Sequence, residues 1–298
     1  MNAAGTTDKI DGQPDCAARR GPNSVESLAN VNRRSWSSRS VVADYRARDA
    51  VWEVERVIFE RYRYALLGKR LLDLGCGAGR TTAALLKYSR DYTGVDYAPR
   101  MVAAFRKKFP QVRIENLDMR DLSLLGAAAF DFALCSFNGL DYMAHSDRLK
   151  TLREIHRVLV DSGLFVFSAH NRNFHHAGTP PRLDLKGTPA EIVRQLLSFV
   201  LDWWHYRRNR RWQVFTEEYA LINDCAHHYS LVTYYIDRQH QAEQLRATGF
   251  ELLETFDRKG NLLPPDTRDA HSSFLYYVAR KVALPAGPVN TSGLESAS

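Results

Sequence analysis

The chain has 298 residues, of which 45% are hydrophobic and 25% are charged, and its formal net charge at pH 7 is +7. This composition is typical of a globular chain that buries one large core. It contains no run of about 18 apolar residues, so we expect no membrane-spanning helix, and residues 1–16 lack the apolar run of a signal peptide. Four cysteines stand without disulfide or metal-ligand spacing, which favours a reducing, cytoplasmic setting (Cys16, Cys76, Cys135 and Cys225).

The N-terminal part of the chain divides into a polar extension and two helices. Residues 1–34 are rich in small and polar types and carry few large apolar groups, so we expect them to be disordered. A short helix is expected around Trp36 and Tyr45. A longer helix follows and stops at Gly68, because apolar residues recur there at steps of three and four: Val54, Val57, Ile58, Tyr62, Ala65 and Leu66.

The segment 70–82 combines a short apolar strand, an acid near its end (Asp73) and a helix that starts at about Thr81. Between strand and helix, glycine occupies every second position: Gly75, Gly77 and Gly79. Such glycines allow a sharp turn and let a ligand lie against the backbone beside the helix N-terminus. A dinucleotide-binding loop would need a small residue where Arg80 stands. The segment therefore predicts a cofactor loop of another kind, the alternative being a tight turn with no ligand.

The same alternation of strands and helices continues along the chain. Further strands are expected at 91–96, 112–116, 130–138 and 163–169, with helices at 99–108 and from Ser146, a candidate N-cap residue, to about 159. Polar residues follow three of these strands at their carboxyl ends, namely Asp96, Asp118 and Asn138. In a parallel sheet, that edge is where ligands bind.

The pattern Asp73-x-Gly75-x-Gly77-x-Gly79, with acids after the next two strands, resembles the class I S-adenosylmethionine-dependent methyltransferases over residues 70–170. This resemblance implies an α/β fold with a doubly wound, seven-stranded, mostly parallel, Rossmann-like sheet. It also implies that S-adenosylmethionine is the cofactor and that the chain is an enzyme.

The resemblance further implies which residues meet the cofactor. The glycine loop and Asp73 would hold the methionine half, Asp96 with its neighbour Tyr97 the ribose, and Asp118 with Met119 the adenine. Asn138 would lie beside the methyl group. In related enzymes an N-terminal segment closes over the cofactor, so Tyr45 either contacts the ligand or packs on the core.

After the fifth strand the chain leaves the minimal pattern, and we interpret residues 171–236 as an inserted cap over the active site. Thr188, Pro189 and Glu191 predict a capped helix start. If the cap encloses a metabolite, the apolar face of this helix around Leu196, Val200 and Trp203 lines or covers the pocket. Two strand-like runs follow at 213–222 and 228–236. Residues 237–282 would complete the core sheet with an antiparallel pair at 250–256 and 273–280, and 283–298 would be a disordered tail.

Methyl transfer from a sulfonium needs a general base only when the nucleophile carries a proton. His170 is the best candidate because it leaves the fifth strand toward the expected cleft, although a structural role for it is the simpler alternative. Asn138 and Tyr142 could orient a substrate. Gly139 follows Asn138, whereas amino-group DNA methyltransferases have two prolines there, so DNA bases are disfavoured.

Two clusters of polar residues suggest other ligands. His175-His176 and the run from Cys225 to His228 could gather a metal, but no complete ligand set is visible and we assign no metal site. Four arginines beside tryptophans have the basic and aromatic character of a nucleic-acid surface: Arg207, Arg208, Arg210 and Arg211. We favour a solvated helix end, because no RNA-binding module is recognisable.

The sequence therefore predicts an S-adenosylmethionine-dependent methyltransferase that acts on the O or N of a small metabolite. An RNA methyltransferase that uses the basic cap edge is the alternative enzyme. A non-catalytic protein that binds S-adenosylmethionine is the alternative from another class. The sequence does not indicate an oligomeric state.

Overall fold

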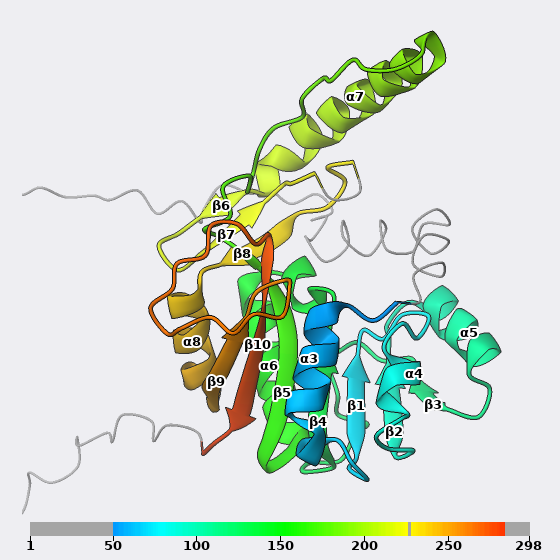
Figure 1. Cartoon of the computed structure of the whole chain (residues 1–298), viewed down its shortest axis with the longest axis vertical. Coiled ribbons are helices and arrows are strands. Elements are labelled where there is room, and N and C mark those ends of the chain that lie inside the picture. The colour runs from blue at the N-terminus through cyan, green and yellow to red at the C-terminus, as the bar shows by residue number, and fades with distance from the viewer. Residues whose placement is uncertain (1–49, 226–227, 284–298) are drawn as a thin grey trace, which may run out of the picture.

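The computed structural model describes residues 50–225 and 228–283, and one mixed sheet organises them (Figure 1). Its central strands follow the order β3-β2-β1-β4-β5, and β10 and β9 continue it from β5. These strands are β1 (Leu71–Leu74), β2 (Tyr92–Val95), β3 (Arg113–Glu115), β4 (Phe130–Cys135), β5 (Leu159–Asn171), β9 (Phe250–Phe256) and β10 (Phe274–Lys281). Only β10 runs antiparallel to its neighbours β5 and β9. The predicted α/β fold is confirmed.

Three short strands of the insertion join the same sheet, which therefore has ten strands in the described residues rather than seven. They are β6 (Val214–Phe215), β7 (Tyr219–Ile222) and β8 (Thr233–Ile236). The predicted run 213–222 thus forms two strands, because Thr216 turns the chain by accepting and donating hydrogen bonds with Tyr219. The insertion extends the sheet rather than standing apart from it.

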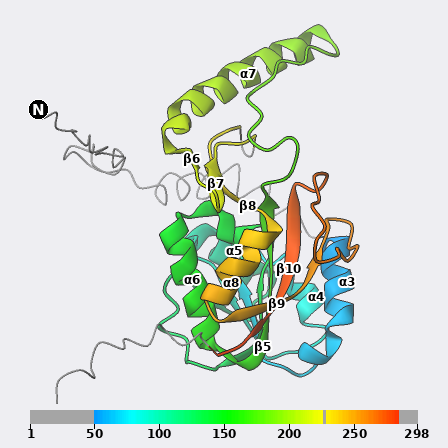
Figure 2. The same cartoon turned by 90° about the vertical axis from the view of Figure 1, so that its left-hand side faces the viewer.

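Helices cover both faces of the sheet (Figure 2). The described helices are α3 (Glu53–Arg61), α4 (Thr82–Leu85), α5 (Pro99–Lys108), α6 (His145–Val158), α7 (Pro189–Asn209) and α8 (Arg238–Ala247), with 3-10 turns η1 (Arg63–Ala65), η2 (Gly139–Tyr142) and η3 (Arg210–Trp212). All of the α-helices except α7 pack on the sheet. None of the helices within the described ranges is long and apolar enough to cross a membrane.

Successive residues of a strand point to opposite faces of the sheet, so the strands contribute side chains to two separate hydrophobic cores. Leu71 and Phe132 pack with α3, α4 and α5 on one face, whereas Leu72 and Phe165 pack with α6 and α8 on the other. With both faces covered, the central strands are buried almost throughout. This arrangement leaves the carboxyl edge of the parallel strands for polar residues.

Two predicted helix ends differ from the structure, and some predicted segments lie outside the described residues. The helix after the fourth strand begins at His145 with Ala144 before it, so the Ser146 cap was wrong. His145 stacks on Tyr219 at 4.3 Å and bonds Tyr234, and these contacts fix the first turn. The helix expected to reach Leu66 ends at Arg61 and continues as η1 before Gly68. The extension 1–34, the helix near Tyr45 and the tail from residue 284 lie outside the described residues.

The capped start of α7 is confirmed, because Thr188 Oγ1 accepts from the Glu191 backbone and Glu191 accepts from the Thr188 backbone. The described chain leaves its apolar face exposed, and the expected role of this face in lining a substrate pocket stays a prediction. Leu196 and Val200 are 41% and 66% exposed. The helix is anchored near its C-terminal end, and its first turns extend away from the sheet (Figures 1 and 2).

Candidate functional site

The glycine loop between β1 and α4 takes the conformation that its sequence predicts. Gly75, Gly77 and Gly79 all have positive φ, at 65°, 57° and 88°. Gly79 is also required for packing, because an added Cβ would lie 2.5 Å from Cε2 of Phe109. The loop therefore brings the backbone to the carboxyl edge of the sheet without side chains of its own.

Asp73 lies beneath this loop and is 1% exposed. Its Oδ2 accepts hydrogen bonds from Thr81 Oγ1 at 2.7 Å and from the Tyr92 hydroxyl at 2.8 Å. Burial raises the pKa of Asp73 to about 6. In this structure the residue ties the loop to β2 and to the start of α4, a role that the sequence did not indicate. Its contact with the cofactor stays a prediction.

The acid at the end of β2 meets the same loop from the other side. Asp96 Oδ2 accepts from the Gly77 backbone N–H at 2.9 Å, and its Oδ1 accepts from the Ala98 backbone N–H at 2.8 Å. The carboxyl group is largely buried, and this burial raises its pKa to about 6. Tyr97 follows it directly. Each carboxylate oxygen has a further lone pair available for a ligand hydroxyl.

The two residues expected at the adenine lie on the next loop. Met119 is 8% exposed, and its Cε lies against Gly75, 3.3 Å from where a Cβ would stand. Asp118 is paired with Arg120, which donates to both of its oxygens at 2.9 and 2.6 Å. Arg120 also donates to Asp147 of α6 at 2.8 Å. The loop thus brings Met119 to the glycine loop, while Asp118 is held by Arg120, and Tyr45 lies outside the described residues.

His170, near the end of β5, is held by a carboxylate that the sequence analysis missed. Asp141 Oδ2 lies 2.7 Å from His170 Nδ1 and also accepts from the His170 backbone N–H at 2.7 Å. Asp141 Oδ1 accepts from Arg148 at 2.6 Å, and both of these side chains are fully buried. Gln241 and Gln244 of α8 accept from the rest of the guanidinium group. The histidine ring is therefore fixed by a network that crosses from η2 to α8.

Asn138 approaches the other nitrogen of this ring, with its Nδ2 3.3 Å from His170 Nε2. Its Oδ1 is buried and has no hydrogen-bond partner. Phe137 and Asn138 both have positive φ, at 57° and 58°, which is strained for phenylalanine. The Asn138 backbone N–H donates to Ser168 Oγ, which helps to hold this turn at the end of β4. Tyr142 lies edge-on to His170, with ring centroids 6.2 Å apart.

Comparison with known proteins places these features in a family. A family model for a methyltransferase domain matches residues 71–163. A Mycobacterium tuberculosis protein named as an S-adenosylmethionine-dependent methyltransferase is 27% identical over 147 residues, 49% of this chain and 52% of its own. Residues 71–163 are therefore a methyltransferase domain, and the relatives support the class I S-adenosylmethionine-dependent type. Its predicted cofactor is likewise confirmed as S-adenosylmethionine.

Other relatives agree with this assignment. A ubiquinone biosynthesis O-methyltransferase of Xanthomonas campestris is 29% identical over 147 residues, 48% of this chain and 57% of its own. The chain thus spans about half the length of the curated relatives it matches. Among solved structures, the Burkholderia thailandensis 1,6-didemethyltoxoflavin-N1-methyltransferase has a TM-score of 0.54 at 20% identity, covering 91% of this chain and 99% of that one. A Clostridium acetobutylicum methyltransferase has the same score at 14% identity, covering 79% and 94%. These two likenesses establish the fold.

A second buried cluster joins helix α3 to the glycine loop. Glu55 of α3 is 1% exposed and pairs with Arg80, the residue after Gly79. Ser136 and Tyr276 also donate to Glu55. Burial alone would raise the pKa of Glu55, but the hydrogen bonds and charge of Arg80 hold it below its ordinary value. The sequence analysis used Arg80 only as evidence against a dinucleotide-binding loop and did not predict its ion pair with Glu55.

The histidines considered as metal ligands and the arginines considered as a nucleic-acid surface lie apart from His170 and the glycine loop. The rings of His175 and His176 are 4.0 Å apart, and His228 pairs with Asp202 at 2.8 Å. Within the described ranges, no group of three or more His, Cys, Asp or Glu side chains could hold a metal ion. In the basic cluster, the guanidinium groups lie over neighbouring tryptophan rings: Arg207 over Trp203, Arg208 over Trp204 and Arg211 over Trp212.

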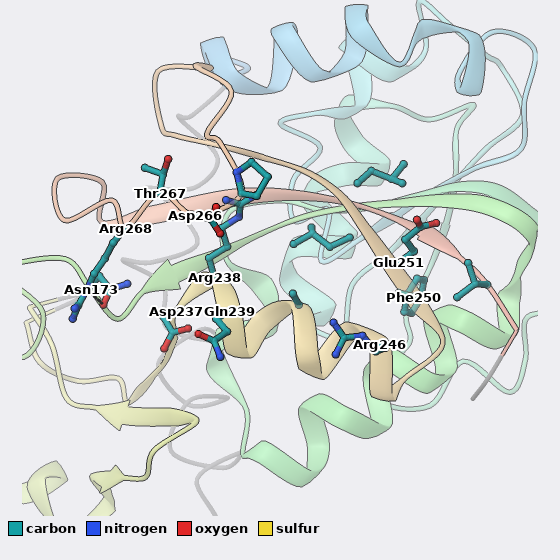
Figure 3. A pocket seen from close by; sticks show the side chains of 15 residues that line it. Asn173, Asp237, Arg238, Gln239, Arg246, Phe250, Glu251, Asp266, Thr267 and Arg268 are labelled. Atoms are coloured by element: carbon teal, nitrogen blue, oxygen red, sulfur yellow. Dashed lines mark hydrogen bonds between the residues drawn. The ribbon is translucent and has the colours of Figure 1, made fainter. Parts of the chain in front are cut away.

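A hollow of about 920 Å³ lies between α8, β9 and the loop before β10 (Figure 3). Its walls carry charges of both signs, including Arg238, Arg246, Asp266 and Glu251. None of the predicted cofactor, substrate or catalytic residues lines it. We therefore centre the candidate site on the glycine loop and the ends of β4 and β5.

Proposed function

We propose that this methyltransferase transfers a methyl group to an O or N atom of a small metabolite by direct in-line displacement. The observation that carries the proposal is the pair of the buried Asp141 and the partly buried His170 beside Asn138, at the carboxyl ends of β4 and β5. S-adenosylmethionine supplies an electrophilic methyl group whose bonding electrons remain on the departing sulfur. The protein has to orient the nucleophile, exclude water and remove any proton that the nucleophile carries.

Removal of that proton is assigned to His170. An Asp141 oxygen 2.7 Å from Nδ1 favours the neutral tautomer with its proton on Nδ1, which makes Nε2 the acceptor. Asn138 Nδ2 approaches Nε2 at 3.3 Å, so a substrate proton would take the place of this contact. A positive charge that then develops on the ring is stabilised by the adjacent carboxylate. Arg148 keeps this carboxylate in place. His170 is 12% exposed, so its proton acceptor is shielded from most of the solvent.

Asn138 is assigned to substrate or cofactor orientation. Leaving a buried polar atom without a partner costs about 1–3 kcal/mol, so the unpaired Oδ1 favours a ligand that donates a hydrogen bond to it. An N–H or O–H group of the substrate, or the amino group of the cofactor, has this chemistry. The strained turn at Phe137 and Asn138 is of the kind that functional sites retain.

A small substrate is supported by the aromatic surroundings of His170. Tyr142 lies on one side of the ring, and Tyr235 of β8 lies on another with ring centroids 5.1 Å apart. Tyr235 is itself held by a hydrogen bond of 2.5 Å to Asp224. The RNA alternative is less well supported, because two of the tryptophan rings that could stack bases already lie beneath Arg207 and Arg208.

The first experiment is transfer of a labelled methyl group from S-adenosylmethionine to a metabolite extract and, separately, to bulk RNA. Label in a small compound is the expected result. Label in RNA that disappears when Arg207, Arg208, Arg210 and Arg211 are replaced by Gln would establish the RNA alternative. Cofactor binding without transfer to either pool would favour the non-catalytic alternative.

The second experiment tests the base. His170→Gln should lower kcat by about 10²–10⁴-fold, while S-adenosylhomocysteine binding is retained. His156→Gln is a matched control, because His156 bonds the Val282 carbonyl outside the candidate site. Asp141→Asn should lower kcat in the same direction. Full activity of His170→Gln would remove the base from the mechanism.

A further inference from the structure

The outer face of α7 carries a continuous apolar stripe that residues 50–225 and 228–283 leave exposed. Six large side chains are between 41% and 68% exposed: Val193, Leu196, Leu197, Val200, Leu201 and Trp204. They recur at steps of three and four, so they lie on one side of the helix over about three turns. A soluble monomer rarely exposes an apolar patch of this extent without a partner.

The opposite side of the same helix is attached to the protein. Asn209 is buried and donates to the Tyr229 carbonyl, and His205 bonds the His228 carbonyl. Farther out, Gln195 exchanges hydrogen bonds with the backbone of Lys186 in the preceding connector. These contacts fix the rotation of α7 about its axis. The apolar stripe is therefore presented to the outside by the fold rather than by chance.

We propose that a second copy of this chain covers the stripe, in an antiparallel pairing of the two α7 helices about a twofold axis. The spacing of the stripe is symmetric about its midpoint between residues 198 and 199. In one antiparallel register Val193 therefore faces Trp204 of the second copy, and Leu196 faces Leu201. Leu197 and Val200 form the central pair. All six side chains find apolar partners, as a twofold contact between identical surfaces requires.

Charge selects this direction over a parallel pairing. Arg207 and Arg208 flank the C-terminal end of the stripe. In a parallel pair the arginines of both copies would meet at the same end and repel one another. In the antiparallel pair they lie roughly 25 Å apart at opposite ends, given a rise of about 1.5 Å per residue. There they face the first turn of the partner helix, which begins with Pro189 and Ala190 and carries the acidic Glu191.

The available area is consistent with a specific but dissociable contact. The exposed parts of the six side chains amount to on the order of 500 Å² per copy, or about 1,000 Å² in the pair. This value lies at the lower limit for specific protein–protein interfaces. The pair is therefore expected to form at micromolar concentration and to dissociate on dilution.

The test is the molar mass of the full chain by sedimentation equilibrium over a range of concentrations. The expected mass rises with concentration toward twice 34.0 kDa. Leu197→Glu and Val200→Lys should each give a monomer. Leu124→Glu is the matched control, because Leu124 is 79% exposed but lies far from α7 in the fold, and it should leave the dimer unchanged. Unchanged circular dichroism and S-adenosylhomocysteine binding would show that each variant is folded.

Mixing the two charged variants tests the register. In the antiparallel pair, Glu at 197 of one copy faces Lys at 200 of the other, so the mixture should recover the dimer that neither variant forms alone. No recovery would overturn the antiparallel register. A parent chain that stays monomeric throughout, or a dimer that persists in both single variants, would overturn the proposal. A monomer that binds vesicles containing anionic lipid through this stripe would assign the face to a membrane surface instead.

Discussion

The ion pair between Glu55 and Arg80 is expected to control the stability of the methyltransferase and the order of its glycine loop. The Glu55 side chain is fully buried and that of Arg80 is 11% exposed. Removing one member of such a pair leaves the other charge buried without its partner, which costs about 3–5 kcal/mol. We expect Glu55→Gln and Arg80→Met each to lower the free energy of unfolding by about this amount. The double variant should lose less than the sum, by about 1–3 kcal/mol, because it contains neither charge.

Urea unfolding of the parent, both single variants and the double variant measures this coupling. Additive losses within about 0.5 kcal/mol would refute the reasoning. The pH dependence gives a second measurement. Because the folded-state pKa of Glu55 lies below its ordinary value of 4.5, the ionised group contributes stability above pH 4.5. That contribution is lost as the pH falls through the lowered folded-state pKa, and Glu55→Gln should remove this part of the acid sensitivity.

Three further predictions concern the glycine loop and Asp96. Gly79→Ala should lower the free energy of unfolding by about 2–5 kcal/mol, since it adds a clash with Phe109 to an unfavourable positive φ. Gly68→Ala, which has the same kind of φ but nothing within 4 Å, should lose only about 1–2 kcal/mol, and equal losses in urea unfolding would contradict this account. Asp96→Ala should weaken S-adenosylhomocysteine binding by about 1.5–3 kcal/mol in calorimetry, and an unchanged affinity would make the residue structural. Burial raises the pKa of Asp96 to about 6, so affinity should fall as the pH drops from 7 to 5; Asp96→Asn should not show this fall.

Local signals in the sequence were enough to locate several elements. The helix α5 and the strand β9 have the predicted bounds, because Pro99 marks the helix start and a run of large apolar residues marks the strand. The capping box at Thr188 likewise marked the start of α7. The start of α6 was missed because stacking of His145 on Tyr219, a residue far along the chain, decides it.

The candidate site was predictable in its residue types but not in its connections. His170, Asn138 and Tyr142 were expected near one another, and the structure brings them together. Asp141 carries no motif of its own, and its role depends on contact with β5 across the sheet. The role of Glu55 in α3 was also not predicted, because its partners are distant in the sequence. Spacing along a chain predicts backbone turns well, whereas ion pairs between distant segments depend on the tertiary fold.

The way in which β8 joins the sheet constrains how this enzyme can change its substrate. At His170, β5 pairs with Phe274 of β10 and with Tyr235 of β8, whereas its pairing with β4 ends at Phe167. A strand has only two edges, so β8 takes over the edge that β4 leaves, directly beside the proposed base. A shift of one residue in β8 would turn Tyr235 to the opposite face and bring Tyr234 in its place. If His170 is the base, replacing side chains within β8, or moving this strand by two residues, would change the surroundings of the base while keeping the same face of β8 toward it.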